Sequence, residues 1–237
     1  MELKKWQKLS GSALKIIAII AMFIDHFTKE IITNKIAIVN RLFSQATIDY
    51  IYFYGRLVIG RLAFPIFCFL LVEGFKHTSN RKKYLMGIGI FALISEIPFD
   101  LFNNNQLIYL SNNNVFFTLF IGLAALMLLE KYKGREIARA IIIMASIIIA
   151  AITGVDYGAL GVILILLIYL ANNRFEYLLL VGSSIFLLNP SVGFFAFISF
   201  LIMGLYNGKR GLNIKYAFYI FYPLHLILLY LLRIYII

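Results

Sequence analysis

Two histidines in apolar surroundings are the side chains of this sequence that are best suited to acid–base chemistry. His26 follows Asp25 in the stretch IIAMFIDHF, and His225 follows Pro223 in FYIFYPLHLILL. Histidine has an ordinary pKa of about 6.5, so it readily moves a proton to or from a reacting group. His26 is therefore a candidate general base. The alternative for both residues is structural, with the ring hydrogen-bonded to a backbone carbonyl or to a carboxylate.

Carboxylates in apolar stretches form a second candidate set. Glu96 and Asp100 lie four residues apart in ISEIPFD, and they share one helical face if the helix continues through the intervening proline. Such a pair needs a partner such as Arg61, His26 or water, or one of the two carboxyl groups stays protonated. In both cases we expect the pair to face the protein interior. Adjacent helical residues do not share a face, so we expect Asp25 to point away from His26, towards Arg61 or another span.

Polar residues also mark several helix ends. Most of them would act as helix caps if each is taken alone, but their common position predicts one polar cavity in the outer half of a membrane, together with the histidines and carboxylates. They are Asn113, Asn114 and Thr118 in NNNVFFTL, Asp156 and Tyr157 in GVDYGALG, and Asn189 with Pro190.

A cluster of basic residues begins at the end of the stretch RLAFPIFCFLLVEGFK, shortly after Glu73. Glu73 is three residues before Lys76, and an ion pair between them is as good an interpretation as a functional role. Lys76, Arg81, Lys82 and Lys83 follow in close succession. Such a cluster usually sets membrane orientation, and it could also hold the phosphates of an acyl donor.

The composition shows what kind of protein holds these candidate groups. Of 237 residues, 62% are hydrophobic and 14% are charged, with a mean hydropathy of +0.90. A soluble domain carries roughly 25% charged residues, so this is an integral membrane protein without a large soluble domain. The net charge of +11 reflects an excess of Lys and Arg at the cytoplasmic face and gives no case for nucleic acid. The lone cysteine, Cys68, excludes an intramolecular disulfide and a cysteine-based metal site, and no metal is predicted.

Apolar runs bounded by charged or turn residues predict an all-α bundle of about 9–10 transmembrane spans in one domain, residues 1–237. Several runs of about 15 residues would span only about 22 Å. The runs are Ser12–Ile32, Leu57–Phe75, Tyr84–Phe102, Val115–Leu129, Ile137–Thr153, Tyr157–Ala171, Phe175–Leu188, Val192–Tyr206 and Tyr216–Tyr235.

The distribution of basic residues predicts a cytoplasmic N-terminus. With that orientation, 16 of the 22 lysines and arginines fall on the inner side, as the positive-inside rule requires. The segment Thr33–Arg56 is ambiguous because its apolar part, Ile48–Tyr54, is too short to span. We interpret it as interfacial or re-entrant, with a tenth crossing as the alternative.

Six strings in this order resemble the TraX family, whose namesake N-acetylates conjugative pilin. They extend from about Leu14 to Leu226 and are LKIIAIIAMFIDH, RLAFPIFCFLLVEGFKHTSNRKKYL, ALISEIPFDL, NNNVFFTL, VDYGALGV and FYPLHL. The family is similar in turn to the acyltransferase-three superfamily, in which a basic residue early in the first helix precedes a catalytic histidine. Lys15 and His26 hold the matching positions, although the superfamily usually has arginine in place of Lys15.

The resemblance implies a bacterial cytoplasmic-membrane enzyme that transfers an acetyl group from acetyl-CoA to an extracytoplasmic amine or hydroxyl. His26 would be the general base, Arg61 would stabilise charge on the carbonyl oxygen, and Asp25, Glu96 and Asp100 would complete the catalytic set. The expected contacts to CoA are Lys15, Lys76, Arg81 and Lys82, and those to the acceptor are Asn114, Thr118, Asp156, Tyr157 and His225. Membrane lipids are the other expected partners.

Two other functions would use the same residues. A proton-coupled transporter or flippase would use the charges as a relay, although the chain lacks the internal symmetry common in transporters. A non-enzymatic assembly factor would use the polar cluster only to hold its helices together.

Overall fold

The computed structural model describes residues 6–33, 42–172, 174–188, 190–213 and 215–236. In these ranges all regular secondary structure is helical, and extended pairing is limited to two isolated bridges, Leu9 with Tyr206 and Asn113 with Val155. The protein is all-α, as predicted. It forms two compact units, Met1–Leu70 together with Arg174–Ile237, and Leu71–Asn173. One domain over residues 1–237 stays a prediction.

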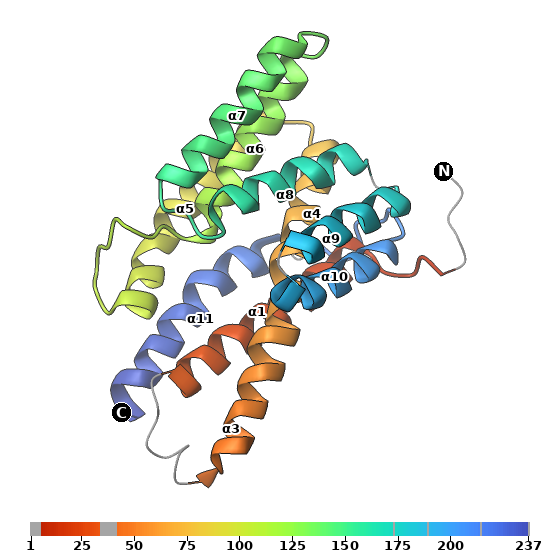
Figure 1. The fold of residues 1–237 in the computed structure, drawn as a ribbon. Coiled ribbons are helices and arrows are strands. Elements are labelled where there is room, and N and C mark those ends of the chain that lie inside the picture. Colours follow the sequence, from red (N-terminus) through yellow and green to blue (C-terminus); the bar gives the residue numbers. More distant parts are fainter. Residues whose placement is uncertain (1–5, 34–41, 173, 189, 214, 237) are drawn as a thin grey trace. The chain divides into compact units, whose positions relative to one another are not determined.

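The first unit contains the two ends of the chain (Figure 1). Its helices are α1 (Gly11–Thr33), α3 (Gln45–Tyr52), the π-helical η1 (Phe53–Ile59), the 3-10 turn η2 (Gly60–Leu62), the first half of α4 (Ala63–His77), α9 (Phe175–Leu188), α10 (Pro190–Gly204) and α11 (Lys215–Ile236).

Helix α1 has one apolar exposed face and one buried face. Ile16, Ile20, Phe23 and Phe27 are exposed and recur at helical spacing, as expected of a face in contact with lipid. The small residues Ala18 and Ala21 lie on the buried side, where they let neighbouring helices approach closely. This asymmetry fixes which side of α1 faces the protein interior.

The segments α3, η1, η2 and α4 join into one helix that runs from Gln45 to His77. It begins at Ser44, whose side-chain oxygen accepts a hydrogen bond from the Thr47 N–H. The predicted start of the second span, Leu57, was therefore wrong. Ile48–Tyr54 forms neither a re-entrant turn nor a separate crossing in the described residues, because no Pro or Gly breaks the chain before Gly55.

Helices α1 and α11 run in the same direction. At their starts, the backbone N–H of Ser12 donates to the Arg210 carbonyl at 2.9 Å, just before α11. Near their ends, Glu30 and Arg233 form an ion pair. Residues separated by some 200 positions in the sequence therefore lie side by side along both helices.

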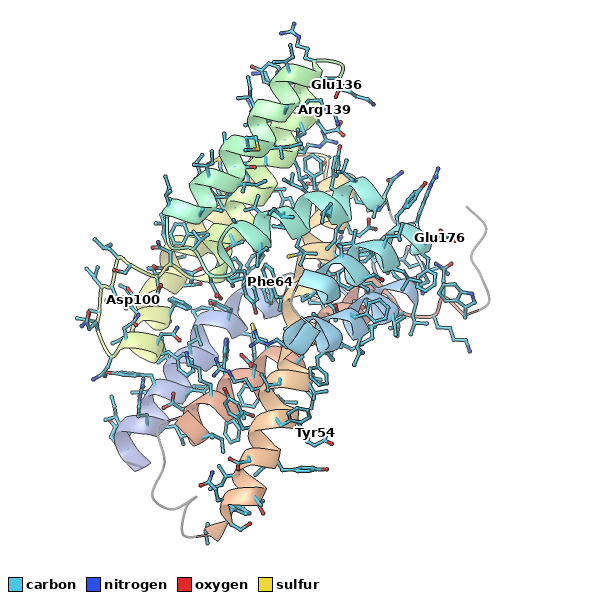
Figure 2. All side chains as sticks on the ribbon, in the orientation of Figure 1. Tyr54, Phe64, Asp100, Glu136, Arg139 and Glu176 are labelled. Atoms are coloured by element: carbon cyan, nitrogen blue, oxygen red, sulfur yellow. The ribbon has the colours of Figure 1, made fainter. Side chains whose placement is uncertain are left out.

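The second unit contains the end of α4, α5 (Arg81–Asn104), α6 (Val115–Lys131), α7 (Glu136–Ile152) and α8 (Gly158–Ala171). Helix α6 packs against α5, α7 and α8 (Figure 1). A Cβ atom at Gly122 of α6 would overlap Ile165 of α8, so the glycine lets these two helices approach closely. Figure 2 shows Glu136 and Arg139 at the exposed start of α7, where they form an ion pair of 3.0 Å.

The helix bounds agree with the predicted apolar runs to within a few residues, apart from the second run. Four stretches in the described ranges are long and apolar enough to cross a membrane: Gly11–Glu30, Gln45–His77, Arg81–Asn104 and Phe218–Tyr235. Helices α6 and α7 have 17 residues each, or about 25 Å. The remaining three have 14 or 15 residues.

Candidate functional site

Two histidines meet in the first unit, one from α1 and one from α11. His26 Nδ1 lies 2.7 Å from His225 Nε2, and the planes of the two rings differ by 8°. His225 Nδ1 lies 2.8 Å from the carbonyl oxygen of Phe221, one turn earlier in α11. This contact with a backbone carbonyl is the structural role that the sequence analysis gave as the alternative to catalysis for His225. The pairing with His26 was not predicted, because nothing in the sequence indicates that α1 and α11 are neighbours.

Asp25 lies on the side of α1 that faces the π-helical turn. A Cβ atom at Gly60 would overlap Asp25 Oδ1, and one at Gly55 would overlap the Thr28 hydroxyl. These two glycines allow α1 to pack directly on η1 and η2. Since π-helical turns are frequent at functional sites, this contact supports the interpretation of the region as a site.

Three cationic side chains lie close enough to the Asp25 carboxylate to interact with it electrostatically, namely Arg56, Arg61 and Lys29. The expected direction of Asp25 towards Arg61 stays a prediction. Arg56 and Lys29 were not among the predicted site residues, although Lys29 is four residues after Asp25 and hence on the same helical face.

An ion pair that was not predicted lies beyond the histidines, one turn further along α1 and two turns further along α11. Glu30 Oε1 is 3.3 Å from Arg233 Nε, and the Glu30 side chain is only 2% exposed. Glu30 is four residues after His26, and Arg233 is eight residues after His225. Those helical spacings were the available signal.

The predicted carboxylate pair lies in the second unit. Helix α5 continues through Pro98 to Asn104, so Glu96 and Asp100 share a face as expected. Glu96 Oε2 accepts hydrogen bonds from the Asn114 backbone N–H at 3.1 Å and from its side-chain amide at 2.5 Å. Asp100 Oδ2 accepts one from the Tyr109 N–H at 2.8 Å, while its buried Oδ1 has no hydrogen-bond partner in the described part of the chain.

Asn114 is the residue that joins α5 to α6. It is completely buried, its Oδ1 caps α6 by accepting from the Phe116 N–H at 2.9 Å, and its Nδ2 donates to the Ala92 carbonyl at 2.8 Å as well as to Glu96. These bonds give Asn114 a structural role in this unit. Its predicted contact with an acceptor stays a prediction.

The loop before α8 carries two more predicted residues. The Thr118 hydroxyl of α6 donates to the Asp156 backbone carbonyl. Tyr157 has a φ of 64°, between Gly154 and Gly158, whose φ angles are also positive. A bulky residue with positive φ is uncommon and often marks a functional or strained position. The side chains of Asp156 and Tyr157 are exposed.

The predicted site residues thus fall into two groups. One group is Asp25, His26, Arg61 and His225 in the first unit, and the other is Glu96, Asp100, Asn114, Thr118, Asp156 and Tyr157 in the second. A single cavity that contains both groups stays a prediction. Asn189 lies outside the described residues, and Pro190 begins α10. Within the described ranges, no cluster of three His, Cys, Asp or Glu side chains could hold a metal ion.

The basic residues near the start of α5 differ in how they are paired. Lys76 Nζ lies 3.7 Å from Glu73, so the predicted alternative of an ion pair is confirmed. Arg81 lies 4.0 Å from Glu130 and covers the Phe75 ring at 4.3 Å. Lys82 is exposed and has no ion pair within the described residues. Lys15 belongs to the first unit and is half-buried.

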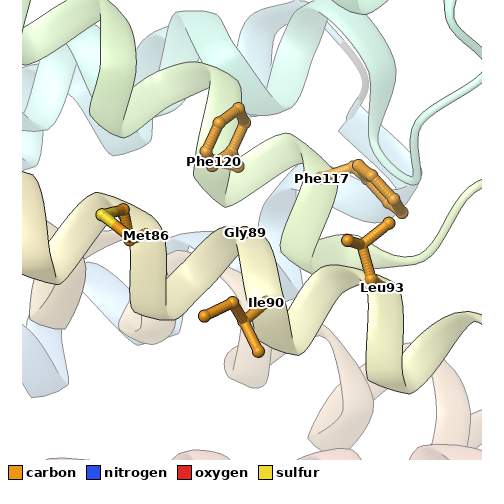
Figure 3. Close-up of a pocket in the computed structure, with 6 residues that line it drawn as sticks. All are labelled: Met86, Gly89, Ile90, Leu93, Phe117 and Phe120. Carbon is orange, nitrogen blue, oxygen red and sulfur yellow. The ribbon is translucent and has the colours of Figure 1, made fainter.

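An apolar groove of about 330 Å³ lies between α5 and α6 (Figure 3). It is formed where Gly89 of α5 leaves space beneath Phe120 of α6. Its lining residues are Met86, Gly89, Ile90, Leu93, Phe117 and Phe120, none of which could take part in acid–base chemistry. None of the candidate catalytic residues lines this groove.

Comparison with known proteins identifies the family. Residues 10–233 match the model of the TraX protein family. The chain belongs to the TraX family. All six strings that carried the resemblance lie within the matched residues, so the predicted TraX membership is confirmed.

A curated relative of this TraX-family chain is a probable fimbrial assembly protein FimC, serogroup H1, from Dichelobacter nodosus. The two chains are 31% identical over 246 residues, which cover 93% of this chain and 94% of the relative. No solved structure matches the chain. The TraX match and the long apolar helices together indicate a membrane protein, of a kind that fits a bacterial membrane. Its relative is named for fimbrial assembly.

Proposed function

We propose that this TraX-family protein is a membrane acyltransferase that transfers an acetyl group from acetyl-CoA to an extracytoplasmic amine or hydroxyl. The observation that carries the proposal is the half-buried His26, hydrogen-bonded to a second histidine in the unit that also holds Asp25 and its cationic neighbours. Acyl transfer needs a general base and a group that stabilises an oxyanion. The relative's name supports a polypeptide acceptor such as a pilin, and a glycan or lipid would react in the same way.

In the proposed reaction, His26 removes a proton from the attacking amine or hydroxyl. The acceptor attacks the thioester carbonyl, a C–N or C–O bond forms, and the C–S bond breaks. The thiolate of CoA then takes the proton from His26. Arg61 stabilises the negative charge that develops on the carbonyl oxygen, and Asp25 orients Arg61 through the electrostatic interaction between them.

The residues of the second unit have proposed roles around the acceptor. Glu96 and Asp100 are proposed to bind the acceptor, and the buried Asp100 oxygen that has no partner in the described residues supports a polar ligand there. Asn114, Thr118, Asp156 and Tyr157 are proposed acceptor contacts, of which Asp156 and Tyr157 have the exposed side chains.

The phosphates of CoA require cations that are not already neutralised. Lys76 and Arg81 each have a carboxylate neighbour, whereas Lys82 is exposed without an ion pair in the described residues. Lys82 therefore fits a phosphate best, and Lys15, Lys76 and Arg81 are weaker proposed contacts. When bound, acetyl-CoA supplies the activated acyl group.

The proposed location is the cytoplasmic membrane of a bacterium, with several crossings and a cytoplasmic N-terminus. The basic segments on one side of the helices support this orientation. It places CoA on the inner side and the acceptor on the outer side.

The test is transfer of radiolabel from acetyl-CoA to an acceptor by the purified full chain in proteoliposomes. We expect His26→Ala to abolish transfer at unchanged abundance, because the base is lost. The matched control is His77→Ala, since the His77 side chain is exposed and its ion-pair partner among the described residues is Glu73, at 3.5 Å; it should retain full activity.

Unchanged transfer by folded His26→Ala protein would overturn the assigned base. Ion-coupled solute uptake without an acylated product would favour a transporter. Equal loss of abundance and activity in the variant would favour an assembly factor.

A further inference from the structure

The hydrogen atoms of the histidine pair can be assigned from one end of its hydrogen-bond chain. A carbonyl oxygen can only accept, so the 2.8 Å contact with Phe221 requires a hydrogen on His225 Nδ1. A neutral imidazole has one N–H, so His225 Nε2 is an acceptor. The 2.7 Å contact then requires that His26 Nδ1 donates. His26 Nε2 is left as the nitrogen with the lone pair.

Aromatic side chains surround the pair and favour its neutral form. The Phe221 ring is stacked on His225 with centroids 4.7 Å apart, and the edges of Phe23 and Tyr222 approach at 6.4 and 5.7 Å. His225 is only 2% exposed. An additional proton would place a positive charge against these apolar groups, which is costly within a membrane.

We infer that His225 is a positioning residue that selects the Nδ1–H tautomer of His26, and so directs the basic Nε2 nitrogen towards the reactants. The inference rests on the proposed function in naming His26 as the base. The opposite tautomer would carry its hydrogen on Nε2 and could not accept a proton there. Enzymes often use a third group to hold a catalytic histidine in one tautomer and orientation. Here that group is a neutral histidine, itself anchored to a helix carbonyl.

The fold holds the two helices so that this geometry is maintained. Helices α1 and α11 are joined at their starts by the bond from Ser12 to the Arg210 carbonyl and near their ends by the ion pair of Glu30 with Arg233. The histidines lie between these two connections. Their separation is therefore fixed from both sides.

During the proposed reaction, the proton from the acceptor moves to His26 Nε2 and passes on to the departing thiolate. His26 is an imidazolium only between these two transfers. Its Nδ1–H keeps donating to His225 Nε2, so the ring does not turn. No other reactant is needed, and the proton count is the same at the end as at the start.

The tautomers can be measured by NMR on the full chain with ¹⁵N-labelled histidine in lipid nanodiscs. His77→Gln removes the third histidine, so only the pair contributes signals. Two-bond ¹⁵N–¹H couplings distinguish Nδ1–H from Nε2–H rings. We expect Nδ1–H for both His26 and His225. An Nε2–H ring at His26 in otherwise wild-type protein would overturn the inference, whatever the enzymatic activity.

Variants at His225 provide the second measurement. His225→Phe should shift His26 towards the Nε2–H tautomer and lower kcat by about 10²–10⁴-fold, by analogy with loss of the orienting group in hydrolase triads. His225→Gln can accept from His26 and donate to Phe221, so it should recover part of the activity. An unchanged tautomer or unchanged kcat in His225→Phe would overturn the inference. Absence of transferase activity in the wild type would overturn the proposed function alone, because the tautomers would still be measurable.

Discussion

At the residue scale, the buried ion pair of Glu30 with Arg233 is expected to be more important for stability than any exposed pair of the chain. Glu30→Gln leaves the arginine beside a neutral side chain in a buried position. Removing one partner of a buried pair costs about 3–5 kcal/mol. We therefore expect a clearly lower thermal unfolding midpoint for purified Glu30→Gln protein in detergent, followed by intrinsic fluorescence.

The matched control for that experiment is the pair of Glu136 with Arg139, in which the carboxylate side chain is 76% exposed (Figure 2). Exposed pairs contribute about 0–1 kcal/mol, because water screens both charges. Glu136→Gln should leave the midpoint nearly unchanged. Equal effects of the two substitutions would show that burial of Glu30 has no energetic consequence.

Individual residue types indicated candidate residues for a site, but not how these residues are arranged. His26, Asp25 and Arg61 could be selected because ionisable groups are rare in apolar helices. The partner of His26 could not, since a hydrogen bond between residues 199 positions apart depends on which helices are neighbours. Glu30 was overlooked because it lies close to the end of its apolar run, where a charge needs no special explanation.

At the element scale, the contact of α1 with the π-helical turn depends on two glycines. Gly60→Ala would place a methyl group against Asp25 Oδ1 and force α1 away from η2. We expect a loss of about 1–3 kcal/mol, as for other overpacked sites, together with reduced acetyl transfer because Asp25 and His26 would move. Thermal unfolding and the transfer assay measure the two effects.

Gly87→Ala serves as the control for this glycine. Gly87 lies within α5, and a Cβ atom added there would meet nothing within 4 Å. Alanine is the better helix former by roughly 0.5–1 kcal/mol, so this variant should be as stable as the wild type or slightly more stable. A Gly60→Ala protein that behaves like Gly87→Ala would contradict the tight packing of α1 on η2.

Element positions were largely predictable from hydropathy, and the exception has a physical cause. Polar and charged residues between Thr33 and Arg56 interrupt the apolar pattern, which suggested a break in the structure. The residues from Gln45 onward nevertheless form a helix, because neither Pro nor Gly, the poorest helix formers, occurs among them before Gly55. Hydropathy reports the environment of a helix, and local residue types decide where it starts.

At the scale of the whole molecule, the orientation in the membrane is open to direct measurement. In a Cys68→Ala background, Gln106→Cys lies in the predicted outer loop and Lys133→Cys in a predicted inner loop, and both native side chains are exposed. An impermeant maleimide should label Gln106→Cys in intact spheroplasts and Lys133→Cys only after permeabilisation. The reverse pattern would contradict a cytoplasmic N-terminus.

Composition was sufficient to predict a membrane protein, because so few charges cannot cover a water-exposed surface. The length and spacing of the apolar runs then predicted an all-α bundle. Charge distribution predicted the orientation but not the division into two compact units. Glu96 and Asp100 were expected to share one polar cavity with His26, because all three have a similar depth in the membrane. That cavity stays a prediction, because depth alone does not determine which helices are in contact.

The continuous helix Gln45–His77 limits how deeply the site can lie in the membrane. Its 33 residues extend about 50 Å, and even a tilt of about 40° leaves a projection of roughly 38 Å across a hydrocarbon layer of about 30 Å. Some of the helix must therefore emerge into the interface. The polar start at Gln45 and Asp49, whose side chains are joined by a bond of 2.8 Å, and the exposed rings of Tyr50 and Tyr54 suit that zone. The π-helical turn begins only about 12 Å further along the helix, so this anchor sets the distance from water at which Asp25 and His26 lie.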